Sequence, residues 1–140
     1  MAAESLKKLH TSLVDTQNAY ELALKDTPDE EVAGIMKQII SLRHTDHLEL
    51  HQALITAGEV PDDRGSFMSV VHENVVAVRA AVSGVDKGSL TAFASGEEKI
   101  VAEYDDAMRE MSANPIVVDI LTRQKDKLLA KITEMKQLSA

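Results

Sequence analysis

Apolar residues recur at intervals of three and four along almost the whole chain, and this period restricts the possible folds more than any other feature of the sequence. A period of three to four residues places apolar side chains on one side of an amphipathic helix. In a half-buried strand, apolar and polar residues would alternate at every second position. The pattern occupies five segments, at about residues 3–24, 28–57, 67–82, 89–111 and 115–140. The sequence therefore predicts an all-α fold.

Short polar segments separate the predicted helices and carry residues that begin and end helices. Thr27 is expected to cap the second helix, with Pro28 at its first position. Gly58 is suited to end that helix in the left-handed conformation. Asn114 and Pro115 are expected to open the last helix in the same way as Thr27 and Pro28. With these boundaries, the sequence predicts four long helices and one short one.

Tight turns join the first two long helices and the last two, so each pair is expected to form an antiparallel hairpin. The short helix predicted at 67–82 would connect the hairpins along the outside of the bundle. This arrangement is a ferritin-like up-down four-helix bundle of two hairpins with a short crossover helix. A chain of 140 residues fits a single domain of this kind.

The composition excludes several classes of function. Without cysteine there is no disulfide framework, no thiolate metal site and no cysteine nucleophile. A net charge of −8 and the absence of tryptophan argue against nucleic-acid binding. No apolar run reaches the roughly 20 residues that cross a bilayer, and the N-terminus does not resemble a secretory signal. We expect a cytoplasmic protein. The oligomeric state is open: hairpin bundles commonly form homodimers, but no exposed heptad seam stands out in this sequence.

Polar residues interrupt the apolar stripe near the middle of each long helix. They are Gln17 and Tyr20 in the first helix, Arg43, Asp46 and His47 in the second, Glu97 and Tyr104 in the fourth, and Gln124 in the last. The middles of antiparallel helices meet at one level, so these residues are expected to form a polar layer across an aliphatic core. One interpretation is a buried hydrogen-bonded layer in which Arg43 pairs with Glu97.

The other interpretation is a metal site at the same level. Its ligands to iron, manganese or zinc would be Asp46, His47, Glu49, His72 and Glu97. A ferritin-like di-iron site requires a Glu from each of two helices and a Glu-x-x-His pair from each of the other two. The nearest pattern here, Glu49-x-x-Gln52, ends in an amide, and the last predicted helix has no inward carboxylate in its middle turns. The complete di-iron ligand set is therefore missing.

The chain resembles a family of uncharacterised bacterial ferritin-like four-helix-bundle domains, a domain of unknown function. The resemblance spans nearly the whole chain and rests on Asp15, Ala19, Tyr20, Arg43, Glu49, Leu50, Gly65, Ser66, His72, Gly96, Glu97 and Tyr104. It implies a ferritin-like fold but no biochemical role, because the role of the family is unassigned.

No motif of a known enzyme class is visible, since a Gly-rich phosphate loop, a nucleophile elbow and a Ser-His-Asp order are all missing. We therefore expect a non-catalytic ferritin-like bundle with a structural, stress-related or interaction role. The alternative is a metal-binding or redox ferritin-like protein with a degenerate site in the middle of the bundle.

Overall fold

Four long α-helices make up most of the described chain, which confirms the predicted all-α class. The computed structural model describes residues 3–25, 27–61 and 87–139. The helices are α1 (Glu4–Leu24), α2 (Glu30–Thr56), α5 (Leu90–Glu110) and α6 (Pro115–Ser139), and a 3-10 turn, η1 (Lys87–Ser89), precedes α5. The helix predicted at 67–82 lies outside the described residues.

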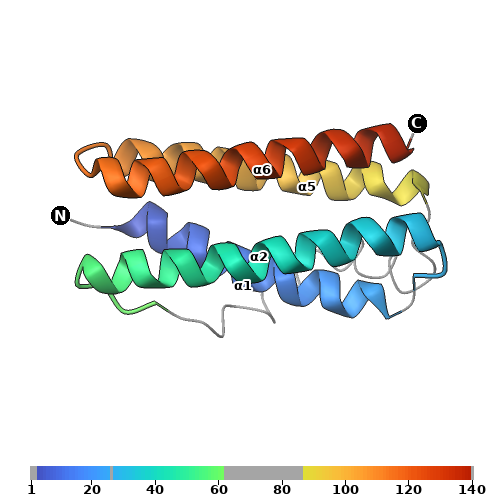
Figure 1. Cartoon of the computed structure of the whole chain (residues 1–140), viewed down its shortest axis with the longest axis horizontal. Helices are drawn as coiled ribbons and strands as arrows, with labels where there is room; N and C mark the ends of the chain where they lie inside the picture. The colour runs from blue at the N-terminus through green and yellow to red at the C-terminus, as the bar shows by residue number, and fades with distance from the viewer. Residues whose placement is uncertain (1–2, 26, 62–86, 140) are drawn as a thin grey trace.

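The helices pack as two pairs, α1 with α2 and α5 with α6, which Figure 1 shows one above the other. Within the first pair, Lys7 near the start of α1 contacts Glu59 just beyond the end of α2 at 3.5 Å. Within the second pair, Glu98 in the N-terminal half of α5 contacts Lys136 near the end of α6 at 2.6 Å, and Asp105 in the C-terminal half contacts Lys125 in the first half of α6 at 2.6 Å. Both pairs are therefore antiparallel hairpins. None of the described helices is long and apolar enough to cross a membrane.

The N-terminus of α1 is held by the end of α5. Ala3 precedes the helix without a side-chain cap. The Glu110 carboxylate instead accepts hydrogen bonds from the backbone N–H groups of Ser5, at 2.9 and 3.0 Å, and of Leu6, at 3.3 Å. These N–H groups have no partner within their own helix, and the helix dipole favours an anion at this end. The contact joins the two hairpins and makes α1 antiparallel to α5.

The core between the helices is aliphatic, as the stripes predict. Its most deeply buried side chains include Leu6, Leu9 and Leu13 of α1, Met36, Ile39, Leu50 and Leu54 of α2, Leu90 of α5, and Leu121 and Leu128 of α6. Burying one such side chain stabilises a fold by about 1.5–3 kcal/mol. The polar residues described below lie within this core.

The N-cap of α2 differs from the prediction. Asp29, and not Thr27, caps the helix, because its Oδ1 accepts from the backbone N–H groups of Glu31 at 2.9 Å and Val32 at 3.1 Å. The Thr27 hydroxyl instead donates to the Ala23 carbonyl at 2.8 Å. The hydroxyl is thus engaged by the last turn of α1, and the next oxygen-bearing side chain takes its place at the start of α2.

The two other predicted helix ends are confirmed. Gly58 follows α2 with a φ of +81°, in the region that favours glycine. Asn114 precedes α6 and its Oδ1 accepts from the Val117 N–H at 3.2 Å, with Pro115 as the first residue of the helix.

Candidate functional site

A buried ion pair between Arg43 and Glu97 lies in the middle of the bundle. Arg43 Nη2 donates to both carboxylate oxygens of Glu97, and the two side chains are 1% and 2% exposed. Arg43 Nε also donates to Thr16 Oγ1 at 3.1 Å. One guanidinium therefore joins α1, α2 and α5 at a single level. Burial opposes the charged form of Arg43, but the Glu97 carboxylate outweighs it, so the pKa of Arg43 is raised.

Tyr20 completes this part of the site. Its hydroxyl donates to Glu97 Oε1 at 3.1 Å from α1. Burial, together with the negative charge of Glu97, raises the pKa of Tyr20 well above its ordinary value. The tyrosine is therefore a neutral hydrogen-bond donor at physiological pH. Glu97 has both its guanidinium partner and this hydroxyl, so it is compensated by the chain itself.

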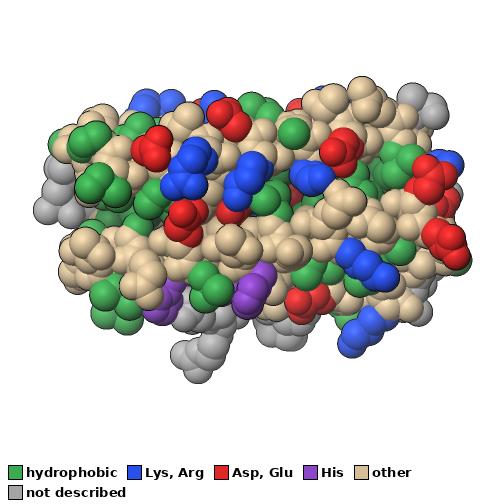
Figure 2. All heavy atoms as spheres, viewed as in Figure 1, with side chains coloured by type: hydrophobic (Ala, Val, Ile, Leu, Met, Phe, Trp, Pro, Cys, Tyr) green, Lys and Arg blue, Asp and Glu red, His purple; other side chains and the backbone are tan. Residues whose placement is uncertain are grey.

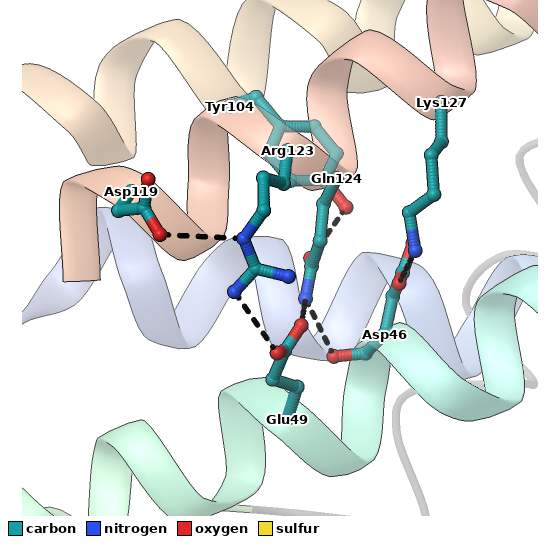
Figure 3. A network of polar contacts seen from close by, with 7 residues as sticks. All are labelled: Asp46, Glu49, Tyr104, Asp119, Arg123, Gln124 and Lys127. Atoms are coloured by element: carbon teal, nitrogen blue, oxygen red, sulfur yellow. Dashed lines mark hydrogen bonds and ion pairs between the residues drawn. The ribbon is translucent and has the colours of Figure 1, made fainter. Parts of the chain in front are cut away.

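A second buried group centres on the Gln124 side-chain amide of α6 (Figure 3). Its Oε1 accepts from the Tyr104 hydroxyl at 2.8 Å. Its Nε2 donates to Glu49 Oε1 at 2.7 Å and to the Asp46 carbonyl oxygen at 3.3 Å. Burial is the main cause that raises the pKa of Tyr104, which keeps its O–H group as a donor. The amide thus links α2, α5 and α6.

Two cations of α6 neutralise the α2 carboxylates beside Gln124. Lys127 Nζ lies 3.0 Å from Asp46 Oδ1. Arg123 Nη2 lies 3.4 Å from Glu49 Oε2, and its Nε lies 3.3 Å from Asp119 on the same helix. Figure 3 shows both cations reaching across from α6 to α2. Asp46 and Glu49 of α2 therefore each have a basic partner on α6.

Among the described residues, the predicted metal ligands do not form one cluster. Asp46, Glu49 and Glu97 are each engaged by a different cation. The His47 ring lies 5.8 Å from the His10 ring, between α1 and α2. His72 lies outside the described residues. In residues 3–25, 27–61 and 87–139, no three His, Asp or Glu side chains are placed so that they could hold a metal ion.

Of the predicted polar layer, Tyr20, Arg43, Tyr104 and Gln124 lie in these two groups, whereas Gln17 does not. Gln17 is partly exposed and donates to Glu21 at 3.2 Å. Thr16 takes its place, since one residue turns the side chain by about 100° around the helix. The Thr16 hydroxyl donates to the Ser12 carbonyl at 2.8 Å, which leaves its oxygen lone pair for Arg43.

Asp46 makes stability depend on pH. Burial raises the pKa of its carboxyl above the ordinary value, and the Lys127 ammonium offsets part of this rise. The folded state then binds the proton more readily than the unfolded state, so stability falls as pH rises from the ordinary value of 3.8 through the raised one. Burial has the same effect on Glu103. We expect the substitution Asp46→Asn to remove the part of this pH-dependent loss of stability that the Asp46 carboxyl causes.

Urea unfolding of the wild type and of Asp46→Asn, from about pH 4 to pH 7, measures this share as a difference in slope. Asp119→Asn is the matched control, because Asp119 is 72% exposed and pairs only with Arg123 among the ion pairs of the described chain. Identical slopes for wild type and Asp46→Asn would contradict the assignment to Asp46.

Residues 1–110 match the family model described as a domain of unknown function, DUF2383. No curated protein and no solved structure shows significant similarity to the chain.

Proposed function

Because this chain belongs to the DUF2383 family, whose description assigns no role, we propose its function from the site itself. It is a non-catalytic, ferritin-like helical bundle with a structural, stress-related or interaction role. The polar layer in the middle of the bundle fixes the alignment of the helices. It is not built to hold a metal.

The observation that carries this proposal is the internal neutralisation of the carboxylates. Glu97 is paired with Arg43, Asp46 with Lys127 and Glu49 with Arg123. A metal ion in this layer would have to displace these cations, and the buried Arg43 guanidinium would repel it. A buried ion pair with complete hydrogen bonds can instead specify which faces of the helices meet.

The connectivity supports the ferritin-like part of the proposal. Since α1 is antiparallel to both α2 and α5, those two helices point in the same direction. The chain therefore leaves α2 at one end of the bundle and enters α5 at the other, a separation of about 40 Å for the 27 residues of α2. Two antiparallel hairpins joined by one long connection are the arrangement of ferritin-like folds.

Elemental analysis of protein purified without a chelator or affinity tag tests the proposal. We expect no stoichiometric iron, manganese or zinc, also after incubation with each ion and desalting. Glu98→Ala is a matched control for Glu97→Ala, because Glu98 is 52% exposed and lies outside the layer. A stoichiometric metal that disappears in Glu97→Ala but not in Glu98→Ala would overturn the proposal in favour of a metal-binding or redox protein.

A further inference from the structure

The C-terminal half of α2 presents an uncharged face to solvent. From residue 41 to residue 58, the exposed side chains and glycine are Ser41, His44, Thr45, Leu48, Gln52, Ile55, Thr56, Ala57 and Gly58. Leu48 is 46% and Ile55 is 51% exposed. Figure 2 shows histidine and hydrophobic side chains over this half of α2. We call Ser41, His44, Thr45, Leu48, Gln52 and Ile55 the α2 face.

The charged residues of this half of α2 point elsewhere. Asp46 and Glu49 pair with cations of α6, and Arg43 is buried against Glu97. In Figure 2, Lys, Arg, Asp and Glu side chains gather along the seam between α2 and α6. Exposed positions of α5 and α6 carry charges, among them Glu98 and Asp126. The α2 face is thus an uncharged surface on a chain with a net charge of −8.

We propose that the α2 face packs against the α2 face of a second copy of this chain, with the two helices antiparallel. The inference rests on the proposed interaction role and names the surface and the partner. Two molecules with a charge of −8 each repel one another, and repulsion is least where the contacting surfaces carry no charge. A strongly acidic or basic partner would find no charge to pair with on this face.

The spacing along α2 suits a contact between identical faces. Leu48 and Ile55 are seven residues apart, and Thr45 and Gln52 complete the spacing of three and four that characterises a helix-pairing seam. In a two-fold antiparallel pair, Leu48 of each copy packs on Ile55 of the other, and Gln52 lies beside the symmetry axis. With two large aliphatic side chains per copy, the contact is smaller than the roughly 800 Å² per partner of a stable interface. The dimer is therefore weak and reversible.

Sedimentation equilibrium from about 1 µM to about 1 mM tests the contact, and we expect a dissociation constant within this range. Leu48→Glu and Ile55→Glu should each raise that constant at least about tenfold, because they place like charges at the contact. Both side chains are exposed, so circular dichroism should show an unchanged helix content. Leu129→Glu on α6 is the matched control, since Leu129 is 41% exposed outside the α2 face and should dimerise like the wild type.

A wild type that stays monomeric over the whole range, or a Leu48→Glu variant that dimerises like the wild type, would overturn the inference. Neither result affects the proposed function, which depends on the metal content.

Disulfide trapping tests the antiparallel register, because the chain has no cysteine of its own. A disulfide requires Cα atoms within about 7 Å. A mixture of Leu48→Cys and Ile55→Cys should cross-link, as should Gln52→Cys alone. Leu48→Cys alone should not, because seven residues separate its position from the partner position by about 10 Å. Stronger cross-linking of Leu48→Cys alone than of the mixture would overturn the register.

Discussion

Glu97→Gln is expected to destabilise the protein by about 3–5 kcal/mol, the usual cost of leaving one member of a buried ion pair without its partner. The substitution keeps the shape of the side chain but removes the charge that compensates Arg43, which is 1% exposed. Tyr20 retains an acceptor, so the loss comes mainly from the uncompensated guanidinium. For a domain of this size, such a loss lowers Tm by roughly 10–15 °C, which thermal unfolding followed by circular dichroism measures.

Glu98→Gln provides the control, because the neighbouring carboxylate is 52% exposed and pairs with Lys136 at the surface. Surface ion pairs contribute about 0–1 kcal/mol, so its melting temperature should hardly change. The double variant Arg43→Leu with Glu97→Leu should be less destabilised than the sum of the two single variants, because no charge is then left buried alone. An unchanged melting temperature for Glu97→Gln would contradict a stabilising role for the pair.

The period of the apolar residues contains enough information to predict the helices and most of the core. Val32, Ile39, Leu50 and Leu54 are all buried on the predicted face of α2. The same period places the buried polar residues, because a polar side chain on an apolar stripe has to enter the core. Arg43 of α2 and Glu97 of α5 were assigned to one level in this way, and the structure places them in contact.

The partners of individual polar groups are harder to predict, because they depend on how far a side chain reaches between helices. Lys127 appears in sequence as one more surface lysine, yet it extends from α6 to the carboxylate of Asp46. The Glu110 carboxylate at the end of α5 serves the first turn of α1, more than one hundred residues away in the chain. Periodicity specifies the face of a helix, and only the packed bundle specifies these pairs.

The α2 face could not be predicted from the sequence for a related reason. Leu48 and Ile55 are two apolar residues among many in this helix, and the buried Leu50 and Leu54 lie close to them along the chain. The apolar period assigns Leu50 and Leu54 to the core, but it does not show that Leu48 and Ile55, on the opposite side of α2, are exposed in the folded chain. The sequence alone therefore did not indicate an interaction surface.

Gln124→Glu is expected to be the second strongly destabilising change, by about 3–5 kcal/mol at neutral pH. The Gln124 amide donates to Glu49 Oε1 at 2.7 Å and to the Asp46 carbonyl at 3.3 Å. A carboxylate at this position would present an acceptor to both oxygens, and burial together with the charge of Glu49 would raise its pKa. The proton that restores a donor then binds more tightly in the folded state than in the unfolded state.

Stability of Gln124→Glu should therefore recover as the pH is lowered through this raised pKa, in the range above the ordinary glutamate value of about 4.3. Urea unfolding at a series of pH values measures the recovery relative to the wild type. Gln124→Leu is the control without a titrating group: like Gln124→Glu it removes the donor to Glu49, and it removes in addition the acceptor of the Tyr104 hydroxyl. Equal pH dependence in the two variants would show that the amide is not needed as a donor to Glu49.

A pH-dependent recovery found only in Gln124→Glu would show that this position requires a hydrogen-bond donor. A ferritin-like metal site needs a carboxylate ligand from α6, and such a recovery would show that a carboxylate at this position of α6 destabilises the polar layer.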